Sequence, residues 1–302
     1  MDMIRVQVPA TTANLGPGFD CLGMALKLYN TVEMQQIATG LNIELHGDGA
    51  NDIDRDENNI VYKAAYKVFN QVGYRPSGLK IRLNNQIPVC RGLGSSAAAI
   101  VGGIIAANIL SGSKLGTKEL LELANEMEGH PDNVAPALIG GIVVSASDED
   151  GVRFIKIQPP TELKTVVAVP DFQLSTKLAR EALPTQVTLQ DAVFNVGRAS
   201  LLVAALCQGD LSKLTYAMED KLHQSYRANL VPGMKKVLAA ARLAGAKGVV
   251  LSGAGPTLIA FADDNFELIA KVMRDTFRES GVMAKVMVLE PSPVGARALE
   301  RV

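Results

Sequence analysis

The chain has no tryptophan, and aromatic residues make up only 5% of its 302 positions. Its core must therefore be packed mainly from aliphatic side chains. It also has no excess of charge, because 30 basic residues nearly cancel 31 acidic ones. This balance argues against nucleic acid or an anionic membrane as a partner. The longest apolar segment, Ala97–Ile105, contains two glycines and is too short to cross a bilayer.

Cysteine is scarce as well. Cys21, Cys90 and Cys207 form an odd set without the spacing of a metal site. This pattern indicates small buried residues in a reducing compartment rather than a disulfide framework. The first ten residues lack the basic start and the apolar run of a secretory signal. We expect a soluble, cytoplasmic protein, long enough for one large or two ordinary domains.

The segment Ile87–Asn108 is the most informative part of the sequence. After a short extended run comes a loop with Gly92 and Gly94, and then a helix of small apolar residues. The free N–H groups and the positive dipole end of such a helix can bind an anion. We expect Ser95 or Ser96 to be the N-cap, which leaves the other hydroxyl for a metal ion bound to phosphate.

This loop differs from the common phosphate-binding motifs. It has no Walker A lysine, and Ala97 stands where a dinucleotide-binding turn has its third glycine. The alternative is a glycine turn that only lets a strand and a helix pack closely. We interpret the segment as a nucleotide phosphate site.

Hydrophobic periodicity predicts an α+β first half without a βαβ rhythm. The expected strands are Ile4–Val8, Thr31–Ile37, Leu41–Leu45, Leu79–Leu83 and the hairpin pair Gly141–Ser147 and Val152–Ile157, and the expected helices are Asn58–Val72 and Thr117–Met127. The EGHPDN segment, which follows the second of these helices, is expected to be a turn, and Pro131 puts His130 in an extended or turn conformation.

The segment Gln158-Pro159-Pro160 marks the expected boundary between domains of residues 1–160 and 161–302. Beyond it we expect strands at Lys164–Val169, Gly248–Leu251, Thr257–Phe261 and Ala284–Leu289, and helices at Asp191–Cys207, Pro232–Ala244 and Asn265–Ser280. The final β-β-α-β order is typical of a small antiparallel sheet backed by helices, in the ferredoxin-like manner.

Three separated blocks carry a family resemblance. They are PATTANLGPGFDCLGMAL at Pro9–Leu26, PVCRGLGSSAAA at Pro88–Ala99 and LSGAGPTLIAF at Leu251–Phe261. Their order and spacing resemble the GHMP small-molecule kinases over almost the whole chain. The first block lacks the basic residue and the Gly-Glu-His ending of galactokinase and mevalonate kinase. It resembles the homoserine kinase branch, as do EGHPDNVAPALIGG and STKLAREALP.

This resemblance implies transfer of the γ-phosphoryl group of ATP, with Mg²⁺, to the side-chain hydroxyl of L-homoserine. The product would be O-phospho-L-homoserine, used in threonine biosynthesis. The resemblance also implies a homodimer and a two-domain fold. Its N-terminal α+β domain would have the left-handed-crossover type topology of the family, its C-terminal domain would be ferredoxin-like, and the site would lie between them.

By the same resemblance the phosphate loop binds the nucleotide, with its main-chain amides as the chief donors. Its members are Pro88, Val89, Cys90, Arg91, Gly92, Leu93, Gly94, Ser95, Ser96, Ala97 and Ala98. Ser96 and Glu122 would bind Mg²⁺. The alternative for Glu122 is a solvated glutamate, because it lies opposite the apolar stripe of its helix.

The amino-acid substrate is a zwitterion, and the planar fork of an arginine suits its carboxylate. The resemblance gives this role to Arg180 and Arg227, although for either one taken alone an ordinary surface arginine is the better interpretation. The ammonium and hydroxyl ends would be surrounded by Asn14, Asp20, His130 and Asp132, with Thr176 beside Arg180. A lone histidine is more often a structural residue than a base.

Phosphoryl transfer requires in-line positioning of the reactants and compensation of the charge on the transferred group. We assign these catalytic roles to Asn14, Asp132, Asn133 and Arg180. Other branches of the superfamily have an aspartate where Asn133 stands, and an amide is a poor proton acceptor. We therefore expect no strong general base, with the proton passing to the phosphate; Asp132 as the base is the alternative. Two other functions stay open, a kinase for an isoprenoid alcohol and a silent relative that senses a small ligand.

Overall fold

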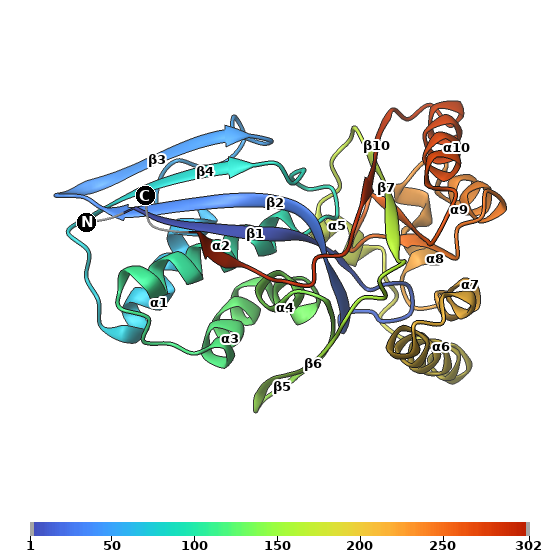
Figure 1. Ribbon diagram of the computed structural model, residues 1–302, viewed down its shortest axis with the longest axis horizontal. Coiled ribbons are helices and arrows are strands. Elements are labelled where there is room, and N and C mark those ends of the chain that lie inside the picture. Colours follow the sequence, from blue (N-terminus) through green and yellow to red (C-terminus); the bar gives the residue numbers. More distant parts are fainter. Residues whose placement is uncertain (1–2, 300–302) are drawn as a thin grey trace.

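The strands of the computed structural model, which describes residues 3–299, fall into two sheets (Figure 1). The first sheet contains β1 (Ile4–Ala13), β2 (Leu22–Gln36), β3 (Gly40–Gly47), β4 (Gly78–Asn85), β5 (Ile142–Asp148), β6 (Gly151–Ile157) and β11 (Arg297–Leu299). Its order is β11-β1-β2-β4-β3, and β5 joins β2 to β6. Among the strands of the described residues only β3 and β4 pair in parallel, and the crossover helix α1 (Ile60–Val72) connects them.

Helices cover one face of this sheet (Figure 1). They are α1, α2 (Ser95–Leu110), α3 (Thr117–Glu128) and α4 (Pro131–Ile139). Asn59 starts α1 by accepting the N–H of Val61 at 2.9 Å, and the buried side chains of α1 lie along one stripe. α2 is apolar on all sides because it is packed between β1 and β2 and the helices α1 and α3.

The other face carries charge instead of helices. One row of residues runs across four strands as Arg5 on β1, Glu33 on β2, Arg82 on β4 and Glu44 on β3. Neighbours in this row form ion pairs of 2.6–3.0 Å. Hydrogen bonds from Lys80 and Arg82 lower the pKa of Glu44 to about 2. Such a charged row lets the sheet face meet water.

The second sheet contains β7 (Lys164–Pro170), β8 (Gly248–Leu251), β9 (Leu258–Ala262) and β10 (Ala284–Leu289). Its order, β10-β7-β9-β8, is antiparallel throughout. The accompanying helices are α5 (Thr176–Glu181), α6 (Leu189–Gln208), α7 (Leu214–Ala217), α8 (Gln224–Arg227), α9 (Met234–Leu243) and α10 (Phe266–Glu279), with short 3₁₀ turns at Leu211–Lys213 and Ala228–Leu230. Numbered along the chain, the strand order is 4-1-3-2, so the ferredoxin-like prediction is confirmed.

Most predicted elements form within a residue or two of their expected bounds, including the β5–β6 hairpin. The expectations missed α4, which was expected to be part of a turn, together with the short elements α5, α7, α8 and β11, and they also missed the second half of β1 and the first half of β2. Pro131 at the first position of α4 is the signal that was available. The expected boundary at residue 160 falls between β6 and β7, while β11 returns to pair with β1 in the first sheet.

Within residues 3–299, α6 is the helix whose length and composition would suffice to cross a membrane, and 22% of that apolar stretch is buried. Its exposed apolar side chains are Leu189, Val193 and Val196. One such helix is weak support for a membrane span, because helices of proteins without a membrane segment pass the same test.

Candidate active site

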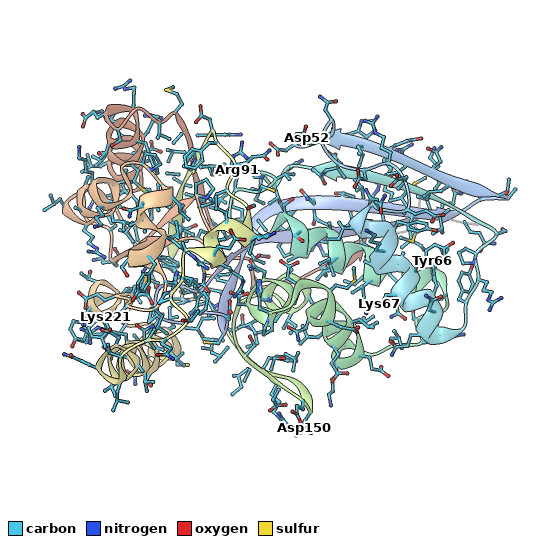
Figure 2. All side chains as sticks on the ribbon, turned by 180° about the vertical axis from the view of Figure 1, so that it is seen from behind. Asp52, Tyr66, Lys67, Arg91, Asp150 and Lys221 are labelled. Atoms are coloured by element: carbon cyan, nitrogen blue, oxygen red, sulfur yellow. The ribbon has the colours of Figure 1, made fainter. Side chains whose placement is uncertain are left out.

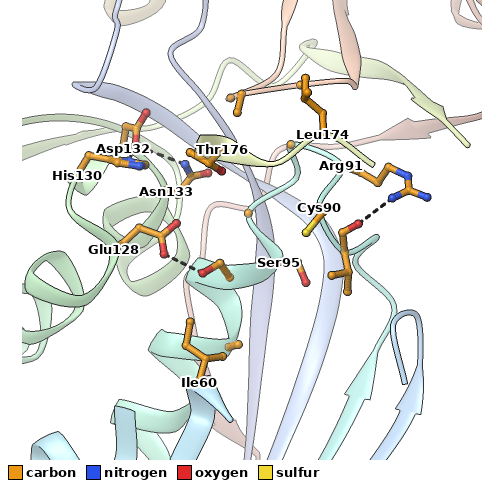
Figure 3. Close-up of a pocket in the computed structure, with 18 of the residues that line it drawn as sticks. Ile60, Cys90, Arg91, Ser95, Glu128, His130, Asp132, Asn133, Leu174 and Thr176 are labelled. Carbon is orange, nitrogen blue, oxygen red and sulfur yellow. Dashed lines mark hydrogen bonds and ion pairs between the residues drawn. The ribbon is translucent and has the colours of Figure 1, made fainter. Parts of the chain in front are cut away.

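A cavity of about 280 Å³ lies where the two sheets meet, and Figure 3 shows residues that line it. Segments far apart in the sequence line it. They come from the first block (Asn14, Phe19, Asp20), the phosphate loop and the start of α2 (Val89–Gly92, Gly94–Ser96), the end of α3 and start of α4 (Glu128, His130, Asp132, Asn133), α5 and its approach (Leu174, Thr176, Arg180), Arg227 and the turn at residues 253–255. The three sequence blocks therefore meet at one place.

The phosphate loop ends at Gly94, which is the N-cap of α2 with φ +68°. No side chain caps this helix, so the prediction that Ser95 or Ser96 is the N-cap is wrong. The reason is local backbone geometry: a left-handed cap residue suits glycine, and both serines fall inside the first turn. The main-chain N–H groups of that turn consequently remain free for an anion at the positive end of the helix dipole.

The loop is braced by the turn between β8 and β9. A Cβ on Gly92, at φ +80°, would lie 2.4 Å from the carbonyl oxygen of Ser252, so only glycine fits there. The guanidinium of Arg91 donates to the carbonyls of Pro170, Val89 and Asp171, each at 3.0 Å. Figure 2 shows Arg91 at the junction of the two halves. Its side chain thus fastens the phosphate loop to the end of β7.

Ser96 donates a 2.9 Å hydrogen bond to the carboxylate of Glu128, which Figure 3 shows directed at the first turn of α2. Glu122, expected beside Ser96, lies elsewhere: its carboxylate is 3.8 Å from Lys118 and next to Gly151. Six residues along α3 turn a side chain by about 240°, so Glu122 and Glu128 occupy different faces. The structure therefore places Glu128, and not the expected Glu122, beside Ser96. Burial raises the pKa of Glu128, and the charge of His130 partly opposes this rise.

Asp20 and Arg180 form a bidentate ion pair of 2.8 and 3.1 Å across 160 positions of sequence. Asp20 belongs to the first block and Arg180 to α5, so the pair joins the two halves of the cavity. Both side chains are more than a third exposed. An ion pair with this exposure contributes little to stability, which means that a ligand can replace it at small cost.

Arg227 is only 2% exposed, although its side chain lines the cavity. It donates to the carbonyls of Ala179 and Gly253 and to Nδ1 of His223, which is itself buried and donates from Nε2 to the Gly16 carbonyl. Among residues 3–299 no carboxylate is hydrogen-bonded to Arg227. Burial, and next the charge of Arg180, lower its pKa to about 10. The guanidinium is thus a buried cation at the wall of the cavity, and the nearby charges of Asp20, Asp220 and Asp132 partly oppose the lowering of its pKa.

His130 and Asp132 form a 2.5 Å contact between Nδ1 and Oδ1 at the start of α4. Burial lowers the pKa of His130, but the hydrogen bond to Asp132 and the charges of Asp132, Asp20 and Glu128 outweigh it and leave the pKa raised. His130 is extended, with φ −157° and ψ 145°, as predicted from Pro131. The raised pKa favours the protonated form of His130 among Asp20, Glu128 and Asp132, the three carboxylates that form the acidic end of the cavity.

Asn14 is 3% exposed and holds two loops together. Its Nδ2 donates to the Gly253 carbonyl at 3.0 Å, and its Oδ1 accepts the N–H of Asp20 at 3.0 Å. Thr176, at the start of α5, is exposed at the rim. The sequence interpretation missed Phe19, whose ring stacks on His223 with 5.2 Å between centroids and lies 5.3 Å from the guanidinium carbon of Arg227. Its position one residue before Asp20 was the available signal.

The site combines an uncapped helix start, a buried carboxylate and a charged pocket, and it lies between an α+β half and a ferredoxin-like half. These features define a GHMP-type small-molecule kinase. The family described as GHMP kinases N terminal domain matches residues 59–141, and GHMP kinases C terminal matches residues 202–279. These matches cover more than half of the chain. Mevalonate kinase from L. major is 19% identical, with a TM-score of 0.72 over 94% of this chain and 95% of that one, and shows the shared fold alone.

Closer relatives narrow the assignment. The homoserine kinase of Carboxydothermus hydrogenoformans is 50% identical over 97% of this chain and 96% of its own length. That of Caldicellulosiruptor saccharolyticus is 49% identical with the same coverage. The crystal structure of homoserine kinase from Cytophaga hutchinsonii is 33% identical and superposes with a TM-score of 0.91 over 99% of this chain and 98% of that one. The chain belongs to the homoserine kinase family of GHMP kinases.

Proposed function

We propose that the chain transfers the γ-phosphoryl group of ATP to the side-chain hydroxyl of L-homoserine, giving O-phospho-L-homoserine for threonine biosynthesis. The observation that carries this proposal is the cavity itself, which joins an anion site at the start of α2 to a pocket with separated positive and negative side chains. The family membership of the chain and the names of its relatives support the same reaction.

The nucleotide part of the site is the loop at residues 88–98. The N–H groups of the first turn of α2 and the helix dipole favour the phosphates, because no side chain competes for these donors. Ser96 and Glu128 suit Mg²⁺, because one hydroxyl and one carboxylate in direct contact at the start of α2 are hard oxygen donors. When bound, Mg²⁺ offsets the negative charge of the phosphates.

The amino-acid part of the site recognises a zwitterion. Arg227 and Arg180 bind the carboxylate, while Asp20, Asp132 and neighbouring His130 surround the ammonium and hydroxyl ends. The Asp20–Arg180 pair supports this arrangement, since the carboxylate and the ammonium of one ligand can replace both of its partners together. A ligand with a single charge leaves one partner unpaired. The pocket therefore favours amino acids over simple alcohols.

The transfer step depends on positioning. Asn133 lies between the acidic end of the cavity and the phosphate loop, where its amide can donate to the oxygens that exchange the phosphoryl group. Oδ1 of Asp132 is hydrogen-bonded to Nδ1 of His130 at 2.5 Å, so this oxygen is not free to accept the proton of the substrate hydroxyl. We infer that the hydroxyl proton passes to the phosphate as the bond forms, which a loose transition state permits.

We also propose that the chain works in the cytoplasm as a homodimer. The apolar residues Leu189, Val193 and Val196, exposed on α6, support a contact between two copies. Light scattering coupled to size-exclusion chromatography tests this: a dimer of wild type that becomes a monomer on Val193→Glu supports the α6 contact. A monomeric wild type contradicts it.

A coupled ADP-release assay with Mg·ATP tests the reaction. L-Homoserine, L-serine, L-threonine and mevalonate are compared at equal concentrations. We expect kcat/KM to be highest for homoserine by at least about a hundredfold, because the pocket pairs both charges and reaches the γ-hydroxyl. Preference for mevalonate, which has no ammonium group, would reject the assignment.

A further inference from the structure

Thr11 on β1 is completely buried, and its hydroxyl lies behind the phosphate loop. It donates a 2.7 Å hydrogen bond to Oδ1 of Asn133, which is 122 positions away in the sequence. The main-chain N–H of Thr11 donates to the carbonyl of Leu93 at 3.1 Å. Thr11 therefore contacts both the phosphate loop, at Leu93, and the side chain of Asn133, which lies between that loop and the acidic end of the cavity.

The hydrogen bonds on both sides of the Asn133 amide define its orientation. Nδ2 lies 3.4 Å from Oδ1 of Asp132, a contact marked in Figure 3. The reversed amide would place its oxygen against the carboxylate of Asp132, which is unfavourable. With Thr11 donating to Oδ1, the amide keeps its Nδ2 donors on the side of Asp132 and the cavity.

Gly94 leaves the space that this contact needs. A Cβ at Gly94 would lie 1.9 Å from Oγ1 of Thr11 and 3.2 Å from Oδ1 of Asn133. The hydroxyl and the amide thus meet directly against the last residue of the phosphate loop. Any shift of one of them moves the amide relative to the phosphates bound by that loop.

We propose that Thr11 is a positioning residue that orients the Asn133 amide toward the acceptor hydroxyl and the transferred phosphoryl group. The inference rests on the proposed kinase reaction. Thr11 does not touch substrate and moves no proton to it; its hydroxyl keeps the amide oxygen occupied so that the amide nitrogen is the group presented to the reacting oxygens. A misoriented amide presents a lone pair to the electron-rich phosphoryl oxygens and loses the stabilising donor.

Thr165 offers a matched control. It is also a fully buried strand threonine, on β7, and its Oγ1 donates to the Leu289 carbonyl at 2.9 Å, outside the cavity. Thr11→Val and Thr165→Val each keep side-chain volume, remove one hydroxyl and leave one acceptor unpaired. Similar losses of thermal stability are therefore expected, but only Thr11→Val should affect the reaction.

The experiment measures single-turnover phosphorylation of homoserine at saturating Mg·ATP for wild type, Thr11→Val, Thr11→Ser, Thr165→Val, Asn133→Ala and the Thr11→Val/Asn133→Ala double variant. Thr11→Val should lower the rate by about tenfold or more, with KM for homoserine changed much less, because the amide acts on the reacting oxygens. Thr11→Ser should restore most of the rate. In the Asn133→Ala background, Thr11→Val should have no further effect.

Three results would overturn the inference: a wild-type rate in folded Thr11→Val, failure of the serine to rescue, or independent, multiplying effects in the double variant. If Thr11→Val does not fold, Thr11→Ala replaces it in the same cycle. A wild-type enzyme that does not phosphorylate homoserine contradicts the proposed function instead, so the two failures are distinguishable.

Discussion

Arg227 allows the sharpest test of substrate recognition. Its guanidinium is 2% exposed and has carbonyl and imidazole partners but no hydrogen-bonded carboxylate in residues 3–299. Arg227→Met removes the buried cation, and Arg227→Lys keeps a charge but loses the planar fork. Because the carboxylate of homoserine is remote from the reacting hydroxyl, its contact with Arg227 is equally strong in the ground and transition states. The loss should therefore fall on KM rather than kcat.

The size of the effect follows from the lost contacts. A bidentate, charge-assisted pair is worth about 3–4 kcal/mol, so Arg227→Met should raise KM for homoserine by about two to three orders of magnitude. Arg227→Lys should raise it by about one to two, since a single-point donor keeps part of the attraction. KM for ATP should stay near its wild-type value, because the guanidinium has no contact with the phosphate loop.

Stability should change little in Arg227→Met. Removal of a buried cation whose pKa is lowered to about 10 is favourable, while the carbonyls of Ala179 and Gly253 lose a donor, which is unfavourable. We expect these opposing effects to cancel to within about 1–2 kcal/mol. Urea unfolding and the ADP-release assay measure the two quantities. Arg198→Lys is the control, because Arg198 pairs with Glu219 outside the cavity. A folded Arg227→Met with wild-type KM would refute the carboxylate assignment.

Three further changes test the rest of the site. Glu128→Gln should weaken the dependence of the rate on Mg²⁺ and lower kcat/KM for Mg·ATP by about tenfold or more. Glu122→Gln should have neither effect. Equal effects of the two variants in a magnesium titration would contradict the assignment of Glu128 as the Mg²⁺ ligand. Gly92→Ala should raise KM for ATP by about tenfold or more, because the added Cβ would lie 2.4 Å from the carbonyl oxygen of Ser252. Gly73→Ala is the control: Gly73 has a similar φ, but an added Cβ meets nothing within 4 Å, so this variant should only reduce the melting temperature. Folding raises the pKa of His130 above its ordinary value of 6.5. Protonated His130 therefore stabilises the folded state below pH 6.5, and this contribution is lost as the pH rises through the folded-state pKa. Urea unfolding of wild type and His130→Asn should differ most near pH 6 and converge at alkaline pH; a difference that grows with pH would show the opposite sign.

Local sequence patterns were sufficient for most elements and for the position of the glycine loop before α2. Apolar periodicity placed α1 and α6, alternation placed β7 and β10, and the glycines before α2 indicated the anion site. These features depend on residues close together in the chain, so a single sequence contains the information. The turn before α4 shows the limit of this approach, because Pro131 both favours an extended His130 and begins a helix.

Tertiary packing alone decided which side chains meet. Glu128 rather than Glu122 reaches Ser96 because the rotation of α3 against α2 is set by the apolar contacts of both helices. The Asp20–Arg180 pair joins residues 160 positions apart, a contact that no local pattern predicts. The sequence by itself thus determined the elements, the phosphate loop and the family resemblance. The partners of each polar group, and therefore its charge and orientation in the cavity, were determined by how the two sheets and their helices pack together.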